Sequence, residues 1–214
     1  MVIEYLGHSC FKLTESTGTS VVCDPYGDVG YVMPQVCADA VTVSHRHYDH
    51  DNTAAVGGNP TVIDAENVRS LPGVEISAVK SFHDGQRGKT RGENVIFKFR
   101  MDGIDVCHLG DLGEACTAEL IDSILPVNVL LIPVGGNYTI DAEMAKEYVD
   151  RIMPDIVIPM HYRTKGCNLD IDKAEKFLCL FDGDNVSETD GSSLELMRSD
   201  LIDGETKVVV LKRR

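Results

Sequence analysis

The sequence predicts an α/β fold of the α+β kind, in which short strands are interspersed with a few helices. Two observations carry this prediction: short apolar runs are separated by turn residues, and later segments space their apolar residues as amphipathic helices do. A mixed order of this kind is typical of sheets covered by helices. The 214 residues suit a single domain, residues 1–214, that can bury a substantial core without disulfides.

The N-terminal part of the chain is expected to be rich in strands. From Val2 to Tyr26, the runs VIEYL, CFKL and SVVC are broken by Gly7 and by the turn STGTS, which predicts successive antiparallel strands. After a loop rich in Gly, Asp and Pro, the apolar run DAVTVSH predicts a strand that is buried on both faces. That strand leads directly into a histidine-rich stretch.

The middle of the chain predicts further strands and a hairpin. Strands are expected over Thr61–Asp64 and Val74–Val79, with a short helix between them near Asp64 to Leu71. The segment NVIFKFRMDGIDVCHLGD predicts a hairpin that turns at Asp102-Gly103, because Asp-Gly is a strong two-residue turn signal. Its second strand is expected to end at Asp111.

The C-terminal half alternates helices with buried strands. Helices are predicted over Thr117–Leu125, Asp141–Ile152 and around Asp172–Phe181, from their caps and apolar faces. The apolar runs VNVLLIPVGG and DIVIPMHY predict two buried strands. Two closing strands are expected to turn at Asp203-Gly204.

The stretch SHRHYDH, residues 44–50, crowds four side chains that can bind metals into six residues: His45, His47, Asp49 and His50. Imidazole nitrogens and carboxylate oxygens are the ligands that zinc, iron and manganese prefer. His45 and His47, two residues apart, can share one ion, and Asp49 and His50 can reach a second ion about 3.5–4 Å away. The alternative is a solvated polar loop, although short histidine-rich tracts are typical of metal sites.

Further candidate ligands share one position in the pattern. His45, His83, Asp111 and His161 each lie at or just past the C-terminal end of a separate predicted strand. If those strands belong to stacked sheets, the four side chains gather at one edge. A separate zinc site built from Cys107, His108 and Cys116 is disfavoured, because neighbouring strand residues point to opposite faces.

The motif HxHxDH after an apolar strand resembles the metallo-β-lactamase superfamily. Further short motifs resemble the small branch of this superfamily that contains ascorbate-6-phosphate lactonase-like and other metal-dependent hydrolases: GHSCF, RGEN, HLGDLG, IPVGG and IPMHY. The resemblance implies a four-layer αββα sandwich. It also implies two divalent ions, zinc first, with manganese or iron as alternatives: His45, His47 and His83 hold one ion, Asp49, His50 and His161 hold the other, and Asp111 bridges them.

Other residues near these motifs have roles that the sequence leaves open. In the resembling family, the position of Asp24 holds the ligand loop, although an ordinary Asp-Pro turn fits equally well. His8 is placed at the rim of the site, with a backbone-bonded core residue or a direct ligand as alternatives. His108 is a supporting or a substrate group. We group His8 and His108 with Asp49 as candidate catalytic residues.

A positive island interrupts an otherwise acidic chain. The segment from Lys80 to Arg100 contains six basic residues and only two acidic ones. Its loop GQRGKTRGEN can hold a phosphate or carboxylate. Arg87, Arg91 and Tyr138 are therefore predicted to contact a small anionic substrate. The alternative is a solvated loop.

The predicted activity is hydrolysis. Two ions can generate a bridging hydroxide near neutral pH, which suits attack on an ester, lactone or phosphoester. A nuclease and a non-hydrolytic metal-binding or redox protein are the alternatives.

Composition limits the partners and the compartment. The net charge of −14 disfavours nucleic acid and anionic membranes as partners. Seven scattered cysteines without a CxxC pair, and no apolar run long enough to span a bilayer, predict a cytoplasmic protein with reduced thiols. A homo-oligomer is compatible with the sequence, which leaves the oligomeric state open.

Overall fold

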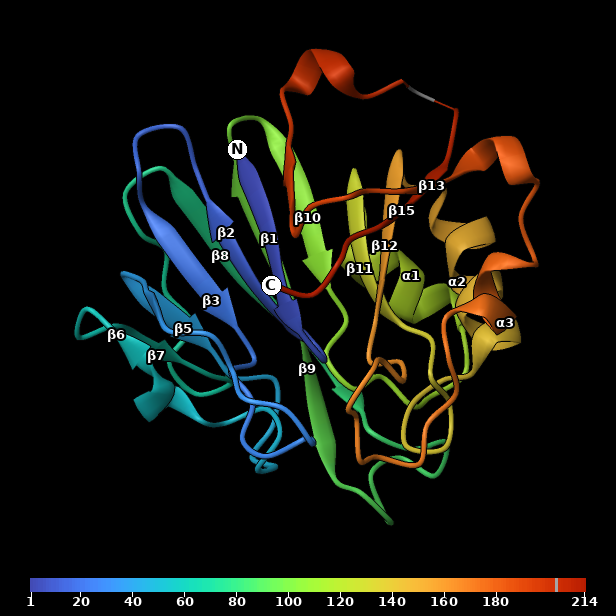
Figure 1. Ribbon diagram of the computed structural model, residues 1–214, viewed down its shortest axis with the longest axis horizontal. Helices are drawn as coiled ribbons and strands as arrows, with labels where there is room; N and C mark the ends of the chain where they lie inside the picture. Colours follow the sequence, from blue (N-terminus) through green and yellow to red (C-terminus); the bar gives the residue numbers. More distant parts are fainter. Residues whose placement is uncertain (203) are drawn as a thin grey trace.

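A six-stranded and a seven-stranded β-sheet pack face to face in the computed structural model, which describes residues 1–202 and 204–214 (Figure 1). The first sheet has the order β14-β1-β2-β3-β5-β7. Its strands span Val2–Gly7 (β1), Cys10–Thr14 (β2), Ser20–Cys23 (β3), Ala40–Thr42 (β5), Thr61–Ile63 (β7) and Ser193–Glu195 (β14). The antiparallel pairing of β1, β2 and β3 confirms the successive strands predicted for the N-terminal segment.

The second sheet has the order β13-β15-β12-β11-β10-β9-β8. Its strands span Val74–Phe82 (β8), Glu93–Met101 (β9), Ile104–His108 (β10), Val129–Pro133 (β11), Ile156–Met160 (β12), Val186–Glu188 (β13) and Lys207–Val210 (β15). Met101 pairs with Ile104 across the turn, so the hairpin predicted at Asp102-Gly103 is confirmed. The second hairpin strand ends at His108, three residues before the predicted end at Asp111.

The helices lie on the outer face of the second sheet (Figure 1). They span Ala118–Ile124 (α1), Ala142–Ile152 (α2) and Glu175–Leu178 (α3). Thr117 caps α1 by accepting a hydrogen bond from the Leu120 amide at 3.2 Å, and Asp141 caps α2 by accepting one from the Met144 amide at 2.9 Å. Within residues 1–202 and 204–214, no helix is both long and apolar enough to cross a membrane.

Three apolar clusters define the layers. One fills the space between the two sheets, and the second lies between the seven-stranded sheet and the helices. The third covers the outer face of the first sheet, and it involves residues 26–38 together with the short pair β4 (Val36–Cys37) and β6 (Val56–Gly57). The predicted α/β class is confirmed. The layer over the first sheet consists of loop, the β4–β6 pair and the 3₁₀ turn Thr53–Ala55 in place of a long helix.

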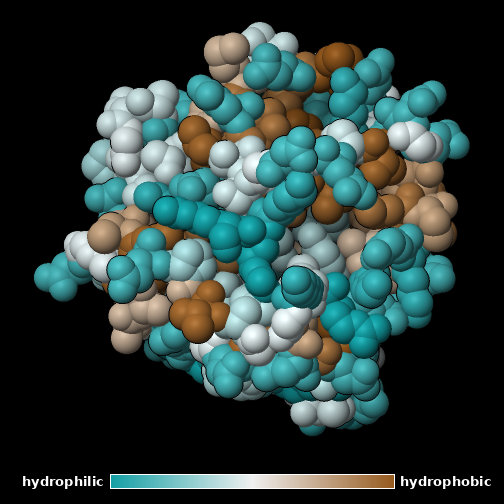
Figure 2. Space-filling model, in the orientation of Figure 1, coloured by the Kyte–Doolittle hydropathy of each residue, from teal (hydrophilic) through white to brown (hydrophobic). Residues whose placement is uncertain are grey.

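The face of the molecule that is viewed in Figure 1 carries mainly polar side chains. Figure 2 shows a largely hydrophilic face on which apolar side chains form separate clusters. All seven cysteines are free, and four of them are buried: Cys10, Cys23, Cys107 and Cys116.

Some predicted elements differ from the structure. Residues 64–71 form turns and irregular chain in place of the predicted helix, because Asp64 and Asn67 bond locally to the backbone and favour a turn. The helix predicted around Asp172–Phe181 is reduced to α3. The last strands, β14 and β15, lie in different sheets, so they do not form a hairpin with each other. The turn predicted at Asp203-Gly204 includes residue 203, which lies outside the described residues.

Four strands of the second sheet run in the same direction, so their C-terminal ends lie at one edge of the sheet. Strand β9 is antiparallel to both β8 and β10, and β10, β11 and β12 pair in parallel. Strands β8, β10, β11 and β12 therefore run in the same direction. The residues that follow their C-terminal ends meet at the same edge of the sheet.

Candidate metal centre

All seven side chains predicted as metal ligands meet at this edge. His83 follows β8, Asp111 lies three residues beyond β10, and His161 follows β12. The other four come from the loop after β5 in the facing sheet: His45, His47, Asp49 and His50. The site therefore joins both sheets, with most of its side chains buried.

Six of the seven side chains fall into two groups, within each of which the candidate ligand atoms lie within 4.8 Å of one another. The first group is His45, His47 and His83. The second is His8, Asp49, His50 and His161, so it contains one histidine more than the sequence predicted as ligands. A third group, Asp24, His45 and His50, shares one histidine with each of them.

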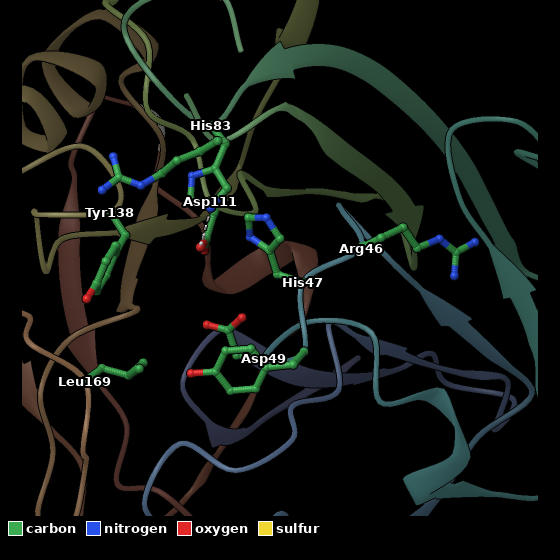
Figure 3. Close-up of a pocket in the computed structure, with 9 residues that line it drawn as sticks. Arg46, His47, Asp49, His83, Asp111, Tyr138 and Leu169 are labelled. Atoms are coloured by element: carbon green, nitrogen blue, oxygen red, sulfur yellow. Dashed lines mark ion pairs between the residues drawn. The ribbon is translucent and has the colours of Figure 1, made fainter. Parts of the chain in front are cut away.

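Asp111 lies between the two groups. Its Oδ2 is 3.3 Å from His83 Nε2 and 3.3 Å from His161 Nε2. Its Oδ1 is 3.2 Å from His50 Nε2, which belongs to the second group. Figure 3 shows the contact between His83 and Asp111 as a dashed line. One carboxylate therefore reaches histidines of both groups.

The free polar atoms of this cluster fit divalent metal ions. Among the residues that the structure describes, the buried atoms His45 Nε2, His50 Nε2 and Asp111 Oδ1 make no hydrogen bond, although His50 Nε2 and Asp111 Oδ1 lie 3.2 Å apart. Leaving such an atom unpaired costs about 1–3 kcal/mol. Imidazole nitrogens and carboxylate oxygens at this spacing are the donor set that zinc, manganese and iron accept. Bound ions would satisfy atoms that the protein itself leaves unpaired.

Asp24 fixes the orientation of two of these histidines. Its carboxylate accepts hydrogen bonds from the Ser44 amide at 2.8 Å, the Ser44 hydroxyl at 2.5 Å and His50 Nδ1 at 2.9 Å. Because the Ser44 hydroxyl donates to Asp24, it can accept from His45 Nδ1 at 2.9 Å. Both histidines thus place their N–H on Nδ1 and leave Nε2 as the free donor atom, as metal-binding histidines do.

Burial and the two carboxylates Asp24 and Asp111 determine the pKa values of the ionisable groups in the cluster. Burial opposes protonation of His50, but Asp111 and Asp24 outweigh it and raise the pKa of His50 well above its usual value. Burial and the charge of His50 lower the pKa of His45 to about 3. Burial would raise the pKa of Asp111, but His161 and His50 hold it well below its usual value. The two carboxylates are therefore ionised and the ring of His45 is neutral, as metal binding requires, whereas His50 without a metal carries a proton that a bound ion would displace.

The backbone around the cluster adopts conformations that ordinary residues rarely take. His8, Asp24 and His161 have φ angles of 55°, 45° and 51°, in the left-handed region. Such residues cost of order 1–3 kcal/mol each and persist where the surroundings hold them in place. Gly110, with φ 57°, is required sterically, because a Cβ there would lie 2.4 Å from Asn94 Oδ1.

The sequence reasoning missed Asn94, which is fully buried beside this glycine. Its side-chain oxygen accepts a hydrogen bond from the Asp111 amide at 2.9 Å, and its Nδ2 donates to Ser81 Oγ at 2.7 Å and Leu109 O at 2.9 Å. Asn94 therefore fixes the backbone that carries Asp111. The only feature of the sequence that pointed to Asn94 was its place in the motif RGEN.

His8 lies deeper than the rim position expected for it, and His108 is also buried. His8 is fully buried beside the second group, not at the rim, with Nε2 3.3 Å from Asp49 Oδ2. Burial and the charge of His161 lower the pKa of His8 to about 4, so this ring is neutral at pH 7. His108 donates from Nε2 to Ser9 O at 2.8 Å and accepts at Nδ1 from the Gly110 amide at 3.2 Å. Both of its ring nitrogens are therefore occupied by backbone, which favours a supporting role over substrate contact.

A cavity of about 440 Å³ opens onto the cluster (Figure 3). It is lined by Arg46, His47, Tyr48, Asp49, His83, Arg91, Asp111, Tyr138 and Leu169. Arg91 stacks on Tyr138, with its guanidinium carbon 5.2 Å from the ring centroid. Arg87 is exposed and does not line this cavity, so the geometry does not support the substrate contact predicted for it.

Comparison with known proteins identifies the family of the chain. The family model of the β-lactamase superfamily domain matches residues 2–161, and the chain belongs to that family. The family resemblance inferred from the sequence motifs is thereby confirmed.

Individual relatives cover most of the chain. A protein of Carboxydothermus hydrogenoformans named UPF0173 metal-dependent hydrolase is 31% identical, over 77% of this chain and 85% of its own. The structure of a Thermotoga maritima protein assigned as a Zn-dependent hydrolase of the metallo-β-lactamase superfamily is 40% identical, with a TM-score of 0.80 and coverage of 98% and 97%. A metallo hydrolase of Ignicoccus hospitalis, 23% identical with a TM-score of 0.65 over 99% and 95% of the chains, shares the fold.

Proposed function

We propose that this protein is a metal-dependent hydrolase that uses two divalent ions to cleave an ester, lactone or phosphoester bond in a small anionic substrate. The observation that carries the proposal is the pair of ligand groups that share Asp111 beside a cavity of about 440 Å³. The names of the relatives, which include metal-dependent and Zn-dependent hydrolases, support the same class.

The first ion would be held by His45, His47 and His83, and the second by Asp49, His50 and His161, with Asp111 between them. Three histidines at the first site suit zinc, and the carboxylates of Asp49 and Asp111 leave manganese and iron as alternatives. When bound, the two ions supply positive charge for a carbonyl or phosphoryl oxygen and lower the pKa of a water that they share. Asp24 keeps His50 aligned for this role through the hydrogen bond to Nδ1.

Asp49 is the residue to which we assign proton transfer. Its carboxylate lines the cavity and lies beside His50, so it can orient the attacking water and accept its proton. His8, neutral and buried, donates from Nε2 to Asp49 Oδ2 and holds that carboxylate in place. We assign His108 a supporting role, because it ties the β1–β2 turn at Ser9 to the turn at Gly110.

Arg91 and Tyr138 would bind a second negative group of the substrate, away from the bond that breaks. The guanidinium stacks on the tyrosine ring at the wall of the cavity, where it can make a charge-assisted contact with a phosphate or carboxylate. A contact of this kind contributes about 1.5–3 kcal/mol, or roughly one to two decades of affinity.

We further propose that the protein works on small molecules in the cytoplasm, and not on nucleic acid or membranes. The net charge of −14 opposes binding to phosphate backbones, and seven free cysteines suit a reducing compartment. Fractionation of cells that express the protein tests the compartment.

Turnover of three substrate types by metal-loaded protein tests the function. The panel contains a γ-lactone, bis(p-nitrophenyl) phosphate and a single-stranded RNA, each assayed with zinc or manganese and again after chelation. We expect cleavage of the lactone or the phosphodiester that is lost on chelation. Cleavage of RNA alone would favour a nuclease. No turnover by protein that carries both ions would favour a non-hydrolytic metal protein.

A further inference from the structure

The carboxylate of Asp84 organises the loop that follows His83. Oδ1 accepts hydrogen bonds from the amides of Gln86 at 2.8 Å and Gly88 at 2.9 Å. Oδ2 accepts from the amides of Thr90 and Arg91, each at 2.8 Å. One buried side chain therefore engages four backbone N–H groups within six residues of loop.

Few other contacts define the conformation of this loop. Gln86, Arg87, Lys89 and Thr90 are exposed, so the loop contributes little to the apolar core. Two backbone hydrogen bonds close the loop, from the Gly92 amide to Gly88 O at 3.0 Å and from the His83 amide to Gly92 O at 3.1 Å. Exposed loops with few apolar contacts open at low free energy, and the four bonds to Asp84 oppose that opening here.

The last amide bound to Asp84 is that of Arg91, the residue whose guanidinium stacks on Tyr138 at the cavity wall. Tyr138 belongs to the loop after β11, so the stack joins two separate loops across the mouth of the site. Fixing the Arg91 amide fixes the point from which its side chain starts. The position of the Arg91 charge at the cavity wall thus depends on Asp84, although Asp84 does not line the cavity.

We propose that Asp84 is a positioning residue for anion recognition: it holds residues 86–91 so that Arg91 presents its guanidinium to the negative group of the substrate. The inference rests on the proposed substrate contact of Arg91. It assigns Asp84 no contact with substrate and no part in bond cleavage.

Binding of a matched pair of non-reacting ligands tests this inference without relying on turnover. Adipate carries two carboxylates and hexanoate carries one, on chains of the same length, so the ratio of their dissociation constants reports the second anionic contact. We expect Asp84→Asn and Arg91→Gln each to lower the preference for adipate by about tenfold. Because Asp84 acts through Arg91, the double variant should lose no more than Arg91→Gln alone.

Three further measurements sharpen the test. Hydrogen exchange at residues 86–91 should accelerate in Asp84→Asn, while metal content stays unchanged. Glu15→Gln is the matched control, because Glu15 also binds backbone amides in a turn, those of Thr17 and Thr19, far along the chain from the site. It should leave the adipate preference intact. If Asp84→Asn does not fold, Asp84→Glu keeps the charge, displaces the acceptors and should show the same pattern with a smaller change.

Three results would overturn the inference: an unchanged adipate preference in folded Asp84 variants, losses that multiply in the double variant, or an equal loss in Glu15→Gln. A lack of substrate turnover would count against the proposed hydrolysis and would leave these binding results interpretable. The two failures are therefore distinguishable.

Discussion

Replacement of Asn94 by alanine removes the side chain that holds the Asp111 backbone. The variant loses three hydrogen bonds, to the Asp111 amide, Ser81 Oγ and Leu109 O. At a net value of about 1 kcal/mol each, their loss lowers the free energy of unfolding by about 3 kcal/mol. Because Asp111 then sits on a less ordered turn, affinity for metal should fall by about 10–100-fold, the range typical of groups that support ligands.

Asn128, the residue before β11, offers a matched control away from the metal centre. Its side chain accepts a hydrogen bond from the Asp105 amide at 3.0 Å and donates to Asp155 at 2.9 Å, away from the metal centre. Asn128→Ala should therefore lower stability by about 2 kcal/mol and leave metal affinity unchanged. Urea unfolding of the metal-free proteins and competitive zinc titration measure the two effects. If Asn94→Ala weakens zinc binding no more than Asn128→Ala, the supporting role of Asn94 is refuted.

Three further predictions address other parts of the site. His161→Ala should abolish hydrolysis and reduce the metal content to one ion while circular dichroism stays native; retained turnover with two ions would disprove its assignment as a ligand. Arg91→Gln should raise KM for a phosphorylated substrate much more than for its unphosphorylated analogue, and equal losses would favour a structural role. Backbone hydrogen bonds, among which the one from the Arg91 amide has the largest effect, lower the pKa of Asp84 from 3.8 to about 2. The difference in the free energy of unfolding between wild type and Asp84→Asn, measured by urea unfolding, should therefore be constant above about pH 5 and decrease as the pH is lowered to about 2. A difference that does not change with pH would contradict the role of the charge.

The position of the ligands could be predicted because it depends on strand periodicity and direction. His83, Asp111 and His161 each follow an apolar run, and apolar runs of that kind predict buried strands that happen here to be parallel. The HxHxDH spacing supplied the remaining ligands. Capping residues likewise located α1 and α2, since caps are a local signal.

Features that depend on tertiary contacts were not predictable. The depth of His8 follows from a left-handed turn between β1 and β2 that packs it against His161, and no local pattern encodes that contact. Asn94 binds the backbone amide of Asp111 in another segment, so its side-chain type alone gave no signal. Arg87 and Arg91 looked equivalent in the sequence, but only Arg91 reaches the cavity wall.

The metal content of the protein tests the central claim most directly. Seven predicted ligands, six of them in two groups with Asp111 between the groups, exceed the four that one tetrahedral ion can use. Elemental analysis of protein purified without chelator, and again after loading with zinc or manganese, gives the ratio of ions to chain. We predict two ions per chain. A ratio of one that persists after loading would contradict the dinuclear site.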